Sequence, residues 1–223
     1  MKHIIDKKTF ITIAVMVFVY VVVSPAVMLY VNDGLHLMLG WNMILAFVPI
    51  VVLYVFGHYI DERTWARVAV FILWLLFYPN SVYIVTDLIY IDSSAFVHVA
   101  SPYVPYVYLE SLDAYVALLH IFIGAIIGLY TGLLGLNVWY ERVPKKWRIP
   151  FLATVFTLSG TAVYIGRFLR YNSWDVLRVF SIIGDLIDRM GWFMIYFIMG
   201  YIILQTMVFL LFRLVSDTKR ETS

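Results

Sequence analysis

The sequence predicts an all-α fold, a polytopic bundle of about six transmembrane helices, from three observations. Hydrophobic residues make up 63% of the 223 residues and charged residues 13%, whereas soluble domains have about 45–50% and about 25%. The apolar residues gather in six runs that approach the roughly 20 residues needed to cross a bilayer. Basic residues concentrate in alternate connections between these runs. We therefore expect residues 1–223 to form a single integral membrane domain.

The first span is expected to be retained in the mature protein. The N-terminal segment MKHIIDKKTF resembles the charged start of a signal peptide. However, the apolar stretch behind it is too long for a signal core, and no small-residue cleavage site is evident. The six expected spans cover residues 9–31, 37–57, 65–90, 112–139, 149–171 and 191–213.

The third span contains the stretch FYPNSVYIVTDL, which is expected to break its helix. Pro79 has no amide hydrogen and clashes with the preceding turn, so the helix should be interrupted there, and Asn80 can cap the next piece. From Asn80 onward, Tyr83, Asp87 and Tyr90 follow at steps of three, four and three, and therefore share one helical face. A polar stripe within a membrane must face protein or water.

The fourth span carries a glycine stripe and, at its start, three groups with acid–base chemistry. Gly124, Gly128 and Gly132 have the four-residue spacing that allows close helix approach. We expect internal packing, with a homo-oligomer through this stripe as the alternative. Before the stripe, one face can carry Glu110, Asp113 and His120.

Two carboxylates and an imidazole can bind a divalent metal or transfer protons. No compact ligand pair supports a metal at Glu110, Asp113 and His120, so we predict no metal and no cofactor, and mainly hydrogen bonds between helices. Asp113 and His120 remain candidates for catalysis, together with Asp87. The other histidines lie near span ends and are expected at the membrane interfaces: His3, His36, His58 and His98.

The fifth span ends in the stretch YIGRFLRYNSWD, and an amphipathic helix is expected near residues 173–190. Asn172 can cap this helix, with Asp175 in its first turn, where the helix dipole favours a carboxylate. Apolar side chains fall on one side of the helix and charged side chains on another. This pattern is typical of a helix that lies on a membrane surface, here the outer one.

The positive-inside rule predicts the orientation. If both termini lie in the cytoplasm, only four of the 16 basic residues lie outside. These four follow the fifth span or end it: Arg167, Arg170, Arg178 and Arg189. Twelve of the 16 basic residues then lie inside: Lys2, Lys7, Lys8, Arg63, Arg67, Arg142, Lys145, Lys146, Arg148, Arg213, Lys219 and Arg220. We therefore expect a protein of the bacterial cytoplasmic membrane.

The two polar stretches are expected to meet near the outer boundary of the membrane. A buried carboxylate such as Asp87 requires a cation or several hydrogen-bond donors, and Arg167 and Arg170 lie at the same end of the bundle. An Asp–Arg pair there either locks two spans together or helps to form a binding pocket. The candidate ligand-binding residues are Asn80, Tyr83, Asp87, Arg167, Arg170, Asn172, Trp174 and Asp175.

The two stretches resemble the signature blocks of a bacterial predicted-membrane-protein family, domain-of-unknown-function family 1361. Tyr171 departs mildly from the family pattern, which often has tryptophan there. The resemblance implies a multi-span protein of the bacterial inner membrane and supplies no activity. The matching residues are Pro79, Asn80, Tyr83, Thr86, Asp87 and Leu88 in the first block, and Gly166, Arg167, Phe168, Arg170, Asn172, Ser173, Trp174 and Asp175 in the second.

Three functional hypotheses follow. The first is an outward-facing polar pocket that binds an anionic lipid or glycan headgroup through the planar guanidinium groups of Arg167 and Arg170. The second is a small transporter or permease subunit that uses Asp87 and His120 for proton coupling, and the third is a structural or assembly subunit without a ligand. Membrane lipids are the expected partners. No basic run indicates nucleic-acid binding, and the absence of cysteine excludes disulfides and thiolate metal sites.

Overall fold

A computed structural model describes residues 4–98 and 107–221 and confirms the all-α bundle. Six helical segments within these ranges are long and apolar enough to cross a membrane. They are built on α1 (Lys7–Val31), α2 (Leu35–Phe56), α3 (Thr64–Tyr83), α4 (Leu112–Arg142), α5 (Arg148–Tyr164) and α7 (Trp192–Glu221).

Shorter elements extend or connect the long helices. The 3₁₀-helices are η1 (Gly57–Ile60), η2 (Ile84–Tyr90), η3 (Ser93–Ala95), η4 (Lys145–Trp147) and η6 (Ser173–Arg178). The π-helical turn η5 (Ile165–Leu169) follows α5, and α6 (Val179–Asp188) follows η6. Two short strands, β1 (Val97–His98) and β2 (Val107–Tyr108), pair antiparallel, with Val97 opposite Tyr108.

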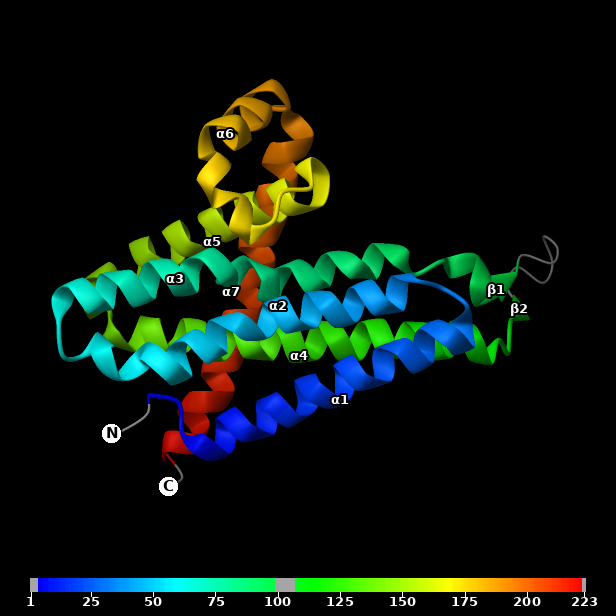
Figure 1. The fold of residues 1–223 in the computed structure, drawn as a ribbon, viewed down its shortest axis with the longest axis horizontal. Helices are drawn as coiled ribbons and strands as arrows, with labels where there is room; N and C mark the ends of the chain where they lie inside the picture. Colours follow the sequence, from blue (N-terminus) through cyan, green and yellow to red (C-terminus); the bar gives the residue numbers. More distant parts are fainter. Residues whose placement is uncertain (1–3, 99–106, 222–223) are drawn as a thin grey trace.

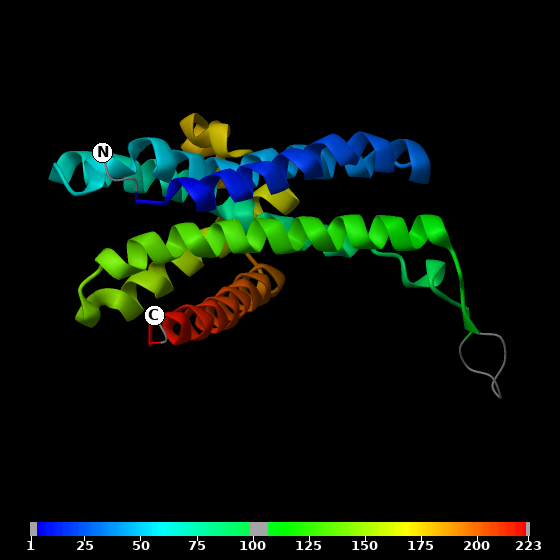
Figure 2. The same ribbon diagram turned by 90° about the horizontal axis from the view of Figure 1, so that it is seen from below.

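Helices α1 to α4 lie side by side along the long axis of the molecule, and α2 contacts the other three (Figure 1). Helix α5 packs mainly on α7 and α3. Both termini lie at one end of the bundle, and the β1–β2 pair lies at the opposite end in both views (Figures 1 and 2).

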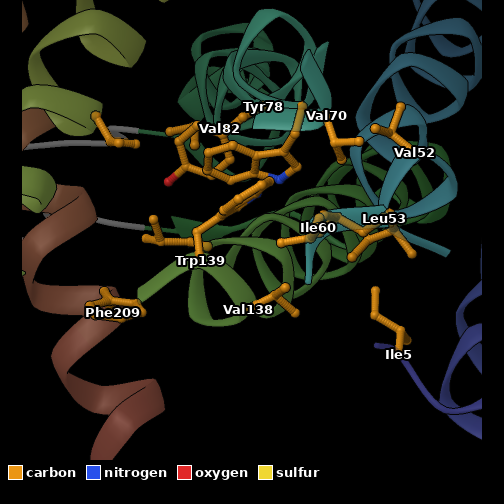
Figure 3. Packing of buried hydrophobic residues seen from close by; sticks show 14 of the residues in the cluster. Ile5, Val52, Leu53, Ile60, Val70, Tyr78, Val82, Val138, Trp139 and Phe209 are labelled. Atoms are coloured by element: carbon orange, nitrogen blue, oxygen red, sulfur yellow. The ribbon is translucent and has the colours of Figure 1, made fainter. Parts of the chain in front are cut away.

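Large aromatic side chains fill the centre of the bundle. Trp74 and Tyr78 of α3 are 0% and 1% exposed, and their rings stack with centroids 4.7 Å apart. Figure 3 shows Tyr78, Trp139 and Phe209 converging from α3, α4 and α7. Because lipid tails are as apolar as these side chains, close packing holds such helices together more than the hydrophobic effect does.

The expected break at Pro79 is wrong. Helix α3 continues through Pro79 to Tyr83, and the geometry changes only at Ile84, where η2 begins. Asn80 does not cap a new helix, because its Nδ2 donates to the carbonyl of Phe77 in the same helix at 3.1 Å. Proline is tolerated inside membrane helices where other groups satisfy the freed backbone, and Pro25 and Pro49 likewise lie inside α1 and α2.

The amphipathic helix expected near residues 173–190 is confirmed as η6 followed by α6. Asn172 and Asp175 form a reciprocal capping box at its start, as their spacing predicts. Helix α6 stands to one side of the bundle, beyond the end of α5 in Figure 1, and it contacts η5 and η6. Leu177 and Phe180 are 92% and 88% exposed, which leaves these apolar side chains available to lipid.

The glycine stripe of α4 faces helices of the same chain. A Cβ added at Gly124 would lie 2.5 Å from the hydroxyl of Tyr20 in α1, and one at Gly132 would lie 2.9 Å from the Cβ of Ser81 in α3. At Gly128 the nearest atoms belong to Ile84 and Ser81. The stripe therefore lets α1 and α3 approach α4 closely.

An ion-pair cluster joins α4, α5 and α7 at the end of the bundle that carries the termini. Glu141 pairs with Arg213 and, at 3.6 Å, with Arg148. The guanidinium carbons of Arg148 and Arg213 also lie 4.4 and 5.2 Å from the centre of the Tyr140 ring. One carboxylate and one aromatic ring thus hold two cations between three helices.

We expect the Glu141→Gln variant to lose about 1–2 kcal/mol of unfolding free energy, because two half-buried guanidinium groups lose their counter-charge. Thermal unfolding in detergent micelles, followed by circular dichroism, measures the loss. Glu62→Gln is the matched control, since Glu62 is exposed. Equal unfolding midpoints for the two variants would contradict the prediction.

Candidate functional site

The predicted pairing of Asp87 with Arg167 is present. Nη2 of Arg167 lies 3.5 Å from Oδ1 of Asp87. The Asp87 side chain is 1% exposed and that of Arg167 is 12% exposed. Asp87 belongs to η2, which continues α3, and Arg167 belongs to the π-turn η5, which continues α5. The pair therefore joins two membrane helices whose polar residues are 80 positions apart in the sequence.

The rest of the Arg167 guanidinium also binds groups of the third span. Nη1 donates to the hydroxyls of Tyr83 and Tyr90 at 3.3 and 3.1 Å, and Nη2 donates to the carbonyl of Thr86. The guanidinium carbon lies 5.4 and 4.9 Å from the centres of the Tyr83 and Tyr90 rings. Arg167 is therefore directed into the protein, where it fastens α5 to η2.

Asn42 of α2 completes the surroundings of Asp87. Its Nδ2 donates to Oδ2 of Asp87 at 3.2 Å, so each carboxylate oxygen has a donor. The sequence interpretation did not select Asn42. The available signal was a single amide in the apolar run LGWNMILAF, because a polar side chain inside a membrane usually bonds to a neighbouring helix.

A cavity of about 220 Å³ opens beside this pair, between α2, α3, α5 and the segment around η6. None of its lining side chains is charged. The apolar wall includes Leu45, Leu76 and Ile165. The polar lining consists of Asn42, Asn80, Tyr83, Tyr171, Asn172 and Ser173.

Two hydrogen bonds fix the rim of the cavity. Nδ2 of Asn80 donates to Oγ of Ser173 at 2.9 Å, which ties α3 to the start of η6. The hydroxyl of Tyr171 donates to Oδ2 of Asp185 at 2.7 Å, and this bond raises the pKa of Tyr171. Tyr171 is therefore a neutral side chain at the cavity.

Three of the eight predicted ligand-binding residues, Asn80, Tyr83 and Asn172, line the cavity. Trp174 is 50% exposed, and Asp175 caps η6 by accepting from the Asn172 amide at 2.8 Å. These two residues do not line the cavity.

Arg170 lies outside the cavity and does not join Asp87. It is exposed, and its φ of 60° places it in the left-handed region, so it does not continue the helical face of Arg167. Arg170 lines a separate hollow, and Asp185 and Asp188 line the same hollow. Only one of the two expected arginines therefore lies at the Asp87 site.

The expected constellation of Glu110, Asp113 and His120 is not assembled. Glu110 and Asp113 are exposed, and Asp113 accepts from the hydroxyl of its neighbour Ser111 at 2.7 Å. His120 is 5% exposed. Within residues 4–98 and 107–221, no three histidine or acidic side chains are arranged to hold a metal ion.

His120 instead meets a second histidine. His36 lies at the start of α2, near a span end, but its side chain is only 1% exposed, and its Nδ1 lies 3.1 Å from Nδ1 of His120. The sequence could not predict the contact between His36 and His120, since a lone histidine near the start of a helix does not reveal which neighbouring helix it meets.

The protein family described as "Protein of unknown function (DUF1361)" matches residues 41–208. The matched region includes both polar stretches and all the residues that line the cavity. No curated protein and no solved structure matches the chain.

Proposed function

The chain belongs to the DUF1361 family, whose description assigns no activity, and from the geometry of the cavity we propose that the protein binds a membrane amphiphile with an uncharged, hydroxyl-rich headgroup. A glycan headgroup is the clearest member of this class. The observation that carries the proposal is the lining of the cavity, which has hydrogen-bonding amides and hydroxyls on one wall and aliphatic side chains on another. Pockets of this kind orient a ligand by a few polar groups and bury its apolar part.

Amide side chains suit sugar hydroxyls because each amide both donates and accepts hydrogen bonds. Asn42, Asn80 and Asn172 line the cavity from three different segments. Both amide hydrogens of Asn80 are used by Phe77 and Ser173, so Asn80 offers its acceptor oxygen. Leu45, Leu76 and Ile165 offer a surface for the apolar part of the same molecule.

The anionic headgroup that the sequence also suggested is less favoured. Arg167 is used by Asp87, Thr86 and two tyrosines, and Arg170 lies in another hollow. A phosphate in the cavity would therefore meet no cation, and burying an unpaired charge is costly. Arg167 acts instead on Tyr83, whose position helps to shape the cavity.

We further propose that the protein resides in a bacterial cytoplasmic membrane with both termini in the cytoplasm and the cavity towards the outer side. The placement of both termini at one end of the bundle supports an even number of crossings (Figure 1). The distribution of the 16 basic residues supports the direction.

The Ala162→Leu variant tests the proposed binding, because Ala162 lines the cavity and a leucine there fills part of it. Purified protein in phosphatidylcholine nanodiscs is offered equal amounts of monohexosyl diacylglycerol and phosphatidylglycerol, and bound lipid is counted by native mass spectrometry. We expect retention of the hexosyl lipid, reduced about tenfold in Ala162→Leu, which corresponds to about 1.4 kcal/mol of binding energy.

Ala153→Leu is the matched control, since Ala153 lies on the same helix and is exposed. It should retain the hexosyl lipid like the unmodified protein. Equal retention in both variants would place the lipid outside the cavity, and a preference for phosphatidylglycerol would overturn the uncharged-headgroup proposal.

A further inference from the structure

A second buried polar cluster lies between α1, α2 and α4, separate from the cavity. It consists of Tyr20 and Ser24 from α1, His36 from α2 and His120 from α4. Their exposed fractions are 5%, 0%, 1% and 5%. Ionisable side chains buried inside a membrane bundle are costly and often functional.

The hydrogen bonds of Ser24 determine which nitrogen of His120 carries hydrogen. Oγ of Ser24 donates to the carbonyl of Tyr20 at 2.8 Å, and this bond uses its one hydrogen. The same Oγ lies 3.1 Å from Nε2 of His120 and must therefore accept there. His120 consequently carries its hydrogen on Nε2, and its Nδ1 has a free lone pair.

That lone pair faces His36. The two Nδ1 atoms are 3.1 Å apart, and the rings meet edge to face at an interplanar angle of 74°. Because Nδ1 of His120 is the acceptor, Nδ1 of His36 is the donor. Nε2 of neutral His36 is then unprotonated and can accept a proton.

The geometry favours a proton over a metal ion. The Tyr20 ring stacks on the His120 ring at 11°, with centroids 4.4 Å apart, so its hydroxyl, 3.4 Å from Nδ1, lies above the imidazole plane. It is not directed along the lone pair. Two nitrogens remain, which is fewer than the three protein ligands of a catalytic zinc site.

We propose that His36 and His120 form a proton-binding site inside the bundle that holds one proton between two imidazoles. The proton adds to Nε2 of His36, which becomes an imidazolium and still donates from Nδ1. Transfer of the Nδ1 proton to Nδ1 of His120 then leaves His36 neutral, protonated on Nε2, and makes His120 the imidazolium. A second proton is excluded because it would place two positive charges side by side.

Three titratable groups from the surrounding elements interact electrostatically with one another or with the two histidines. Tyr20 comes from α1, Asp33 from the turn before α2, and Asp87 from η2. The Asp33 carboxylate acts on His36, and the Asp87 carboxylate acts on Tyr20, which covers His120. Asp87 also pairs with Arg167 at 3.5 Å.

Nitrogen-15 NMR of histidine-labelled protein in bilayers tests the proposal across about pH 5 to 8, the range of ordinary histidine titration. At high pH, His120 should show a protonated Nε2 and a bare Nδ1. On acidification, the signals of His36 and His120 should change together in one step that takes up a single proton. Independent titration of the two rings, or no change in either ring over this range, would overturn the proposal.

The His36→Asn variant keeps a donor towards His120 but removes the nitrogen that accepts the proton. We expect His120 to remain neutral over the same range in this variant. His58→Asn is the control and should leave the joint step unchanged. If His120 of His36→Asn still takes up a proton at the same pH, the site is not the pair; if this variant does not fold, the unmodified protein's titration decides alone.

Discussion

The Arg167→Met variant should lose about 3–5 kcal/mol of unfolding free energy, the typical cost of leaving one partner of a buried ion pair alone. Asp87 would keep only the amide of Asn42 as a donor, and the hydroxyls of Tyr83 and Tyr90 would lose the guanidinium. Methionine retains much of the side-chain volume of arginine, so the loss of unfolding free energy comes mainly from the missing positive charge. Thermal unfolding in detergent micelles measures the loss.

Arg170→Met is the matched control, because Arg170 is exposed and lies three residues away. It should change stability little. The double variant Asp87→Asn with Arg167→Met should recover much of the loss, since no unpaired charge remains. If the two arginine variants unfold at the same temperature, the contact between Asp87 and Arg167 does not stabilise the bundle.

Gly128→Leu should lose about 3 kcal/mol, at the upper end of the usual cost of overpacking. A Cβ at this position would lie 2.8 Å from Cδ1 of Ile84 and 3.1 Å from the carbonyl oxygen of Ser81. The isoleucine side chain can rotate away, but the backbone carbonyl cannot, so α3 and α4 must separate. The Asp87 site lies at the end of the displaced α3 and should be disturbed as well.

Gly200→Leu is the control for this variant, because Gly200 lies in a membrane helix, α7, and an added Cβ would meet nothing within 4 Å. Unfolding midpoints of the two leucine variants are compared in the same detergent. Similar values would mean that the glycine of α4 is not needed for the approach of α3.

The sequence predicted the bundle and the pair of Asp87 and Arg167 because both follow from the cost of polar groups in lipid. Six apolar runs require helices, and a carboxylate within one of them requires a cation from another. These constraints apply whatever the detailed packing.

The failures share a different cause. Pro79 was expected to end a helix, but α3 continues through it to Tyr83. Arg170 was expected to join Arg167 at the Asp87 site, yet the helical turn that carries Arg167 ends at Leu169. His36 and Asn42 have partners on other helices that no pattern within one helix can identify. Local periodicity therefore predicts which side chains share a face, but not which faces meet.

The separation of Asp87 and Arg167 by 80 positions has a consequence for biosynthesis. At about 5–20 residues per second, a ribosome makes Arg167 about 4–16 s after Asp87. During that interval the third span must enter the bilayer without its cation. Asp87 lies near the end of this span, so the cost is below the value of about 2.5–3.5 kcal/mol for an aspartate at the centre of a helix. An 18-residue stretch of this span has a mean hydropathy of 2.0, which can offset the cost, so the apolar residues of the third span serve insertion before they serve packing.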